Sequence, residues 1–101
     1  MASRLQLQSK LEDLLESKNV YYQPPESKKI EYPAIIYSKN RISLTKANDT
    51  KYLERNQYSI TVVSRLPDNA VISKILELPY SSYDRSYVSD NLYHDVITLY
   101  F

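Results

Sequence analysis

The 101-residue sequence contains no glycine at all, although average usage is about 7%. Glycine is the residue that takes positive φ without steric cost and lets backbone approach a ligand closely. Phosphate-cradling loops and dinucleotide-binding turns depend on it. We therefore expect neither in this chain, and we expect its turns to use proline, asparagine and aspartate. The candidates are Pro24-Pro25, Lys39-Asn40, Asn48-Asp49, Pro67-Asp68-Asn69 and Ser89-Asp90-Asn91.

The length fits one domain with a single core, here residues 1–101. No apolar run approaches the roughly 20 residues that cross a bilayer, and the start MASRLQLQSK lacks the apolar stretch of a signal peptide. A soluble protein without membrane contact is the expectation. The absence of cysteine excludes disulfides and thiolate chemistry and suits a reducing cytoplasm.

Two patterns predict helices. Leu7, Leu11, Leu14 and Leu15 share one face of an amphipathic helix over residues 3–18. A second helix opens at Pro67-Asp68 and ends at Leu78, before a proline.

Strands are predicted between and after these helices, over residues 20–22, 34–37, 58–62, 83–88 and 92–101. The fold class expected is a small α+β domain, with about five mostly antiparallel strands and two helices on one face. The long polar stretch from Lys39 to Lys51 shows no period and is expected to be a functional or mobile loop that orders on docking.

The net charge of +1 gives no electrostatic footprint for binding nucleic acid. The charge is nevertheless uneven. Residues 39–55 hold five bases against two acids, whereas residues 77–101 hold four acids against Arg85. Two interpretations are open: an ordinary solvated surface, or opposite poles of one subunit that meet head to tail in a ring.

Candidate catalytic and metal-binding residues are few. His94, the only histidine, precedes Asp95 in a predicted strand, where adjacent side chains point to opposite faces. The spacing of Asp84, Asp90 and Asp95 fits no calcium loop, and Asp90-Asn91 is better explained as a turn. We expect no catalytic residue, no metal site and no cofactor.

Eleven tyrosines are too many for so small a core. Tyrosine is enriched both in strands and at protein interfaces. Five of them lie in residues 80–101, a segment that ends on apolar residues and is expected to be packed to its end. We expect this segment to divide, with residues 92–101 forming an inner strand and residues 80–87 lying nearer an interface. Loss of Tyr100 and Phe101 is then expected to unfold the domain, whereas Tyr83→Ala and Tyr87→Ala are expected to impair assembly only. The predicted interface residues are Tyr80, Tyr83, Asp84, Arg85, Tyr87, Tyr93, Lys46, Lys51 and Arg55.

Several blocks of the sequence together resemble the tail-completion proteins, also called tail terminators or head–tail joining proteins, of long-tailed bacteriophages and prophages of Gram-positive bacteria. The most specific block is YDRSYVSDNLYH at residues 83–94, followed by an apolar end. The others are NVYYQPPES at 19–27, YPAIIY at 32–37, YSITVV at 58–63 and LPY at 78–80. With the Leu-rich first helix, the resemblance covers nearly the whole chain.

The resemblance implies a structural virion protein without catalytic residues. Proteins of this family form a ring, commonly a hexamer, on the last ring of the tail tube and present a surface to the head connector. The expected partners are therefore copies of the same chain, the tail tube protein and the connector or stopper protein, with DNA only passing through the lumen. The expected location is the tail or neck of the virion, after synthesis in the host cytoplasm.

Two alternatives remain open. A head-side connector or stopper subunit would occupy the next ring of the neck. A small enzyme or regulator would use His94 and nearby acids, and His94→Ala would abolish its function.

Overall fold

The computed structural model describes residues 4–25, 27–47, 51–67 and 69–101, with backbone only at 41–47 and 51–55. The elements agree in order with the prediction from sequence, and the α+β class is confirmed. They are α1 (Arg4–Leu15), β1 (Val20–Tyr22), β2 (Ala34–Ala47), β3 (Lys51–Ser64), α2 (Ala70–Leu76), β4 (Ser81–Ser89) and β5 (Leu92–Tyr100).

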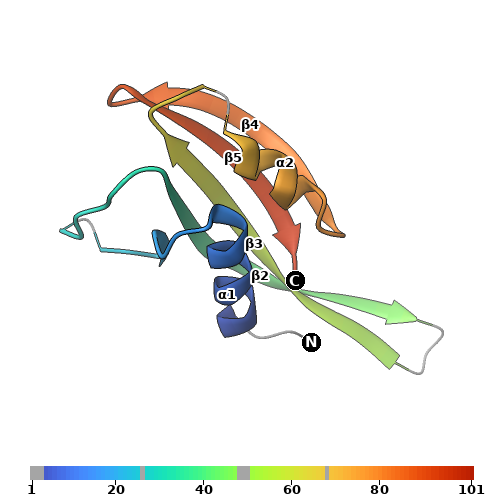
Figure 1. Cartoon of the computed structure of the whole chain (residues 1–101). Coiled ribbons are helices and arrows are strands. Elements are labelled where there is room, and N and C mark those ends of the chain that lie inside the picture. Colours follow the sequence, from blue (N-terminus) through green and yellow to red (C-terminus); the bar gives the residue numbers. More distant parts are fainter. Residues whose placement is uncertain (1–3, 26, 48–50, 68) are drawn as a thin grey trace.

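The five strands form one sheet in the order β1-β2-β3-β5-β4 (Figure 1). Only β1 and β2 run parallel; the other neighbours are antiparallel. The C-terminal strand β5 therefore lies inside the sheet, between β3 and β4. This position explains why it is apolar on both sides near its end, where Val96, Ile97 and Leu99 are buried.

Both helices cover the same face of the sheet, and the core lies beneath them (Figure 1). Leu7 and Leu11 of α1 and Val71 and Ile75 of α2 are buried. The sheet supplies residues that the register places in rows on one face, such as Tyr37, Ile60 and Ile97. The predicted apolar stripe of the first helix is confirmed as core packing, since Leu14 and Leu15 also pack against the cluster.

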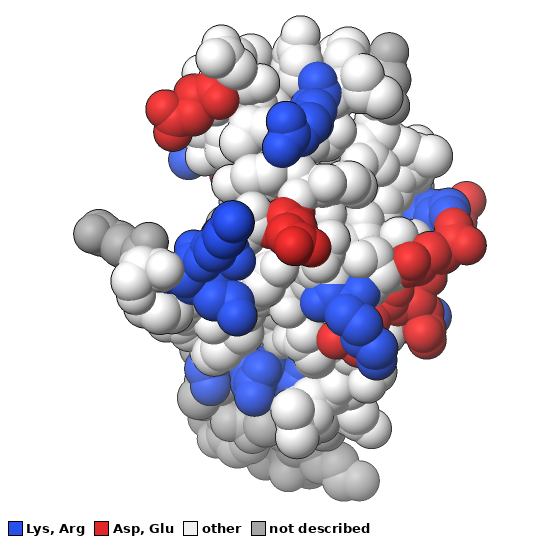
Figure 2. Space-filling view, turned by 60° about the vertical axis from the view of Figure 1, so that its left-hand side comes forward, with Lys and Arg blue, Asp and Glu red and all other residues white. Residues whose placement is uncertain are grey.

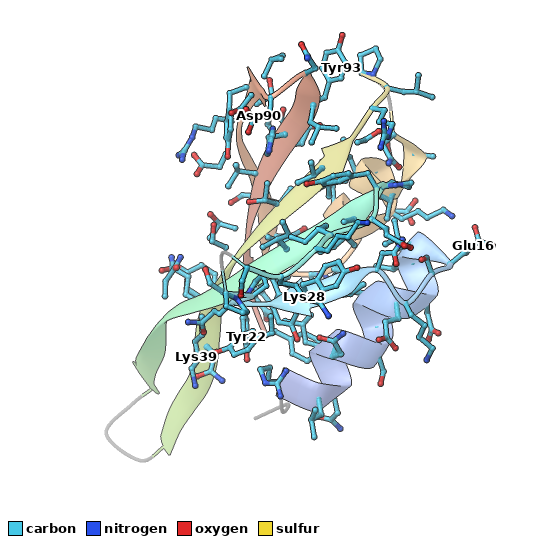
Figure 3. The ribbon with its side chains drawn as sticks, turned by 90° about the vertical axis from the view of Figure 1, so that its left-hand side faces the viewer. Glu16, Tyr22, Lys28, Lys39, Asp90 and Tyr93 are labelled. Carbon is cyan, nitrogen blue, oxygen red and sulfur yellow. The ribbon has the colours of Figure 1, made fainter. Side chains whose placement is uncertain are left out.

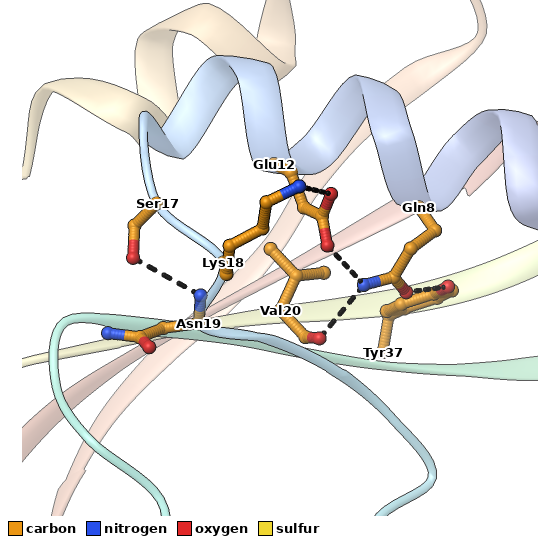
Figure 4. A network of polar contacts seen from close by, with 7 residues as sticks. All are labelled: Gln8, Glu12, Ser17, Lys18, Asn19, Val20 and Tyr37. Atoms are coloured by element: carbon orange, nitrogen blue, oxygen red, sulfur yellow. Dashed lines mark hydrogen bonds and ion pairs between the residues drawn. The ribbon is translucent and has the colours of Figure 1, made fainter.

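A hydrogen-bonded network ties α1 to the sheet beside this core (Figure 4). The Gln8 amide donates to the Val20 carbonyl oxygen at 2.9 Å and to the Glu12 carboxylate at 3.1 Å. Its own oxygen accepts from the Tyr37 hydroxyl. The Gln8 bond is the first cause of a lowered Glu12 pKa, to which Lys18 adds. Burial raises the pKa of Tyr37, although the Arg4 guanidinium acts in the opposite direction.

Chain reversals work without glycine by placing other residues at positive φ. Glu16, which follows α1, has φ 59°, and the Ser17 amide donates back to the Glu12 carbonyl. That bond is the signature of a Schellman ending, in which glycine is the usual residue at the left-handed position. The predicted turn after β4 is confirmed: Asp90 and Asn91 have φ of 54° and 62°, as a two-residue type I′ hairpin turn requires.

The second helix is shorter than predicted. It begins at Ala70 and ends at Leu76, rather than spanning Pro67 to Leu78. The difference has a local cause, because the Asn69 side chain accepts a hydrogen bond from the Val71 amide at 3.0 Å and so caps the helix later. At its other end, Leu78 is joined to the helix only by a turn bond to the Ile75 carbonyl.

The predicted loop from Lys39 to Lys51 is wrong. Strand β2 continues to Ala47 and β3 begins at Lys51, so that register pairs run from Arg41–Gln57 to Ala47–Lys51. The predicted turn at Lys39-Asn40 is wrong too, because the register shifts there by a bulge while the strand continues. The predicted turn at Asn48-Asp49 lies outside the described residues.

Candidate interaction surface

Strand β4 is an outer strand of the sheet and pairs with β5 alone. Every residue from Ser82 to Ser89 is exposed, and only Ser81 is half-buried. Helix α2 reaches only the start of the strand, where the Ser81 hydroxyl donates to the carbonyl oxygens of Leu78 at 2.7 Å and Leu76 at 3.3 Å. Among the described residues, no strand pairs with the outer side of the rest of β4, and such a free edge is a template for pairing with another strand.

Large apolar side chains gather on this edge and on the adjoining turn. Val88 is 64% exposed and Tyr80 is 60% exposed, while Tyr83, Tyr87 and Tyr93 are between about one third and one half exposed. Exposed aromatic and aliphatic residues concentrated in one place mark interaction sites more often than scattered ones. The predicted interface tyrosines therefore all lie on one hairpin, here called the terminal hairpin (residues 80–100).

Polar contacts hold this tyrosine surface in shape. The Tyr83 hydroxyl donates to the Asp95 carboxylate at 2.7 Å, and the Arg85 guanidinium contacts the neighbouring Asp84 carboxylate at 3.3 Å. A hydrogen bond with Ser86 lowers the pKa of Tyr83, but the Asp95 bond and charge raise it, and the net direction is upward.

His94 stacks on Tyr87 directly across the hairpin. The two rings are 4.7 Å apart between centroids and 8° from parallel, and the His94 ring nitrogen Nδ1 lies 3.1 Å from the Leu92 carbonyl oxygen. Asp95 belongs to the opposite face, where it meets Tyr83, as the alternation of a strand predicts. These contacts assign His94 a packing role in the hairpin.

A hollow of about 280 Å³ opens beside the hairpin. Its lining includes exposed Val88 and Tyr93 together with Pro67 from the chain before α2. No group of three or more histidine, cysteine, aspartate or glutamate residues that could hold a metal ion exists within the described ranges. The hollow is lined by both apolar and polar side chains, the polar ones including Ser86 and Asp95.

A second surface extends from the other end of the molecule (Figure 1). Strand β3 begins to pair with β5 at Gln57. In the part of β3 that precedes Gln57, strands β2 and β3 pair only with each other. We call residues 41–47 and 51–55 the ribbon. Its base is fixed by Phe101, whose backbone exchanges two hydrogen bonds with that of Asn56. The molecule is consequently long, 49 Å by 25 Å by 22 Å.

The structure divides the predicted interface residues between these two surfaces. Tyr80, Tyr83, Asp84, Arg85, Tyr87 and Tyr93 lie on or beside the terminal hairpin. The backbones of Lys46, Lys51 and Arg55 lie in the ribbon, and their side chains are outside the described part of the chain. Figure 3 places Asp90 and Tyr93 at one end of the molecule and Lys39 at the base of the ribbon toward the other.

Charged side chains of both signs are spread over the face of the molecule in Figure 2. Acidic groups lie at the upper left, in the centre and toward the right-hand margin, with basic groups between and around them. In sequence, the stretch 39–55 has five basic and two acidic residues, and the terminal hairpin has three aspartates and one arginine. The two stretches of sequence thus differ in the sign of their net charge.

The ribbon is not predicted by its sequence, where a loop is expected instead. A signal was present: Ile42 and Leu44 alternate with Ser43 and Thr45, which is the period of a strand. The lysines and asparagines around this short alternation gave it the composition of a loop.

No protein-family model matches the chain, and no curated protein matches it. None of the described helices is long and apolar enough to cross a membrane.

Proposed function

We propose that this protein is a non-enzymatic virion assembly protein, a tail-completion subunit of a long-tailed bacteriophage or prophage. In this role a ring of copies, commonly six, caps the tail tube and joins the tail to the head connector. The observation that carries the proposal is the pair of unpartnered β surfaces at opposite ends of one small domain.

The two surfaces suit a ring because they differ from one another. A ring requires heterologous contacts, in which one patch of a subunit meets a different patch of the next and the rotation closes. The terminal hairpin supplies exposed tyrosines and aspartates, and the ribbon supplies unpaired strand edges and a basic sequence. Complementary charge across such a contact fixes its orientation.

The charge of the whole chain also supports the role. DNA must pass through the lumen of such a ring, and a strongly basic wall would retain its phosphates. A net charge of +1 avoids this. The stacked and half-buried environment of His94 supports the absence of catalysis better than it supports an enzyme.

Electron microscopy of tails assembled with and without the protein tests the proposal. If the protein ends tube growth, tubes made without it are overlong. If it only joins the tail to the head, tubes are of normal length but carry no heads. Complete, head-bearing particles of normal length in its absence would contradict both roles.

Fractionation of a lysate separates the tail-side role from its nearest alternative. A tail-completion protein travels with tails that lack heads, whereas a head-side connector or stopper subunit travels with heads that lack tails. Recovery in neither fraction would contradict a place in the neck.

A further inference from the structure

The outer edge of β4 and the strands of the ribbon could each provide the other with a further strand to pair with. An isolated two-stranded ribbon is at best marginally stable in water, and from Arg41 to Ala47 the strand β2 pairs with nothing but β3. The β4 edge is a nine-residue strand with a single partner. Adding a strand to an exposed sheet edge gives affinity through main-chain hydrogen bonds.

We propose that the ribbon of one copy adds to the free edge of β4 in the next copy, so that the sheets of neighbouring subunits become continuous. This inference rests on the proposed ring and names the surfaces that build it. The occupant of the β4 edge is thus a second copy of this chain, and the contact is head to tail.

Charge selects the ribbon over a second β4 edge. A symmetric β4–β4 pair would bring the exposed aspartates of two terminal hairpins, Asp84 and Asp90, to the same contact, which like charges disfavour. The ribbon instead brings a stretch with an excess of three positive charges. The contact therefore favours the head-to-tail arrangement and weakens as salt is added.

Side chains beside the edge give the contact its specificity. Strand addition places alternate side chains of the incoming strand near those of β4, whose exposed members include Tyr83, Tyr87 and Val88. The register shift between Tyr83 and Arg85 is a bulge, and bulges restrict which strands can pair along an edge. The proposal accordingly centres on the segment from Arg85 to Ser89, beyond the bulge.

Site-directed cross-linking tests the proposal, because the chain has no cysteine of its own. Three matched serine-to-cysteine variants serve: Ser43→Cys in the ribbon, Ser86→Cys on β4 and Ser73→Cys on the exposed side of α2. The variants are mixed in pairs at high protein concentration, and each mixture is treated with a short bismaleimide. Circular dichroism confirms that each variant keeps the wild-type fold.

The expected result is a linked heterodimer from the S43C and S86C mixture. Its yield should exceed, several-fold, that of either variant alone and that of the S43C and S73C mixture. A chain that carries both S43C and S86C should give a ladder of larger products. Neutralising the hairpin with Asp84→Asn and Asp90→Asn, or adding salt, should lower the yield.

Two results would overturn the proposal. Linking by S86C alone that exceeds the mixture would mean symmetric pairing of two β4 edges. A mixture no better than the S73C control would mean that the ribbon does not reach β4. If light scattering still detects a ring on tail tubes in that case, the proposed function is retained although the proposed contact is wrong. If the protein is absent from the neck, the proposed function is wrong, but the cross-linking result is unaffected.

Discussion

The body of the molecule and its extensions are made from similar residues but are stabilised differently. The body consists of α1, α2 and the parts of the sheet beneath them; the extensions are the ribbon and β4 beyond Ser81. In the body, Tyr37 and Tyr58 are buried, whereas Tyr83 and Tyr87 in the extension are about half exposed. One residue type thus supplies core in one region and contact surface in the other, according to the position of its strand in the sheet.

A large difference in stability is expected between substitutions in the two neighbouring strands of the terminal hairpin. Ile97 of β5 is completely buried, so Ile97→Ala should lower the free energy of unfolding by about 2–5 kcal/mol, because it removes apolar contacts and leaves a cavity. Val88→Ala on β4 should change it by about 0.5 kcal/mol or less, because Val88 is largely exposed. Urea denaturation measures both. Similar losses in the two variants would contradict the division between body and extension.

A smaller effect is expected from one hydroxyl group in the body. Tyr37→Phe removes the donor to the Gln8 amide oxygen and should cost about 1–2 kcal/mol, since a partly buried acceptor is left unsatisfied. Tyr87→Phe keeps the ring that stacks on His94 and should cost much less. Urea denaturation of the two variants at neutral pH tests the difference, and equal costs would contradict a structural role for the Gln8 network.

Tyr37 is also expected to make the protein less stable in alkali. The pKa of Tyr37 in the folded protein is raised above the ordinary value of about 10, chiefly by burial. As the pH rises, Tyr37 therefore loses its proton in the unfolded chain at a lower pH than in the folded protein. The contribution of the protonated hydroxyl to the free energy of unfolding is complete below about pH 10 and is lost as the pH rises through the folded pKa. Denaturation midpoints measured between neutral pH and pH 11 should fall less steeply in Tyr37→Phe than in Tyr87→Phe.

The sequence predicts the body well because its signals are local and agree with its packing. The leucines of the first helix are spaced for one face, and residues 58–62 alternate as a half-buried strand should. The Asp90-Asn91 turn was identifiable because both residues tolerate positive φ.

The ribbon was not predicted because its composition is that of a surface segment. The backbones of its two strands pair with each other, and the alternation of Ile42 and Leu44 is too short to stand out among the polar residues around it. The free edge of β4 was equally hidden, because strand order is a property of the whole fold. Sequence could nominate Tyr83 and Tyr87, but only the order β3-β5-β4 shows that they flank an open edge.

Relief of backbone strain in the body is expected to raise the stability of the protein, whereas the substitutions above lower it. Glu16 occupies a left-handed position that glycine adopts at lower cost, so Glu16→Gly should raise the free energy of unfolding by about 1 kcal/mol. Glu16→Ala is the matched control, because it removes the same exposed ion pair with Lys74 but keeps a β-carbon. A glycine variant no more stable than the alanine variant would show that this position is not strained.

Tyr83 on β4 is expected to contribute little to the stability of the fold but to matter for assembly. Tyr83→Ala on β4 removes an exposed hydrogen bond to Asp95 and should alter the free energy of unfolding by about 0.5 kcal/mol. The same substitution at Tyr58 in the body should cost about 3–5 kcal/mol.

Binding to assembled tail tubes, measured by co-sedimentation and light scattering, supplies the second half of this test. Because the exposed Tyr83 side chain lies beside the proposed contact, the folded Tyr83→Ala protein should form rings only at higher concentrations than the wild type does. Ring formation equal to that of the wild type would mean that the tyrosines of the terminal hairpin are not subunit contacts. The difference between Tyr83 and Tyr58 would then reflect burial alone.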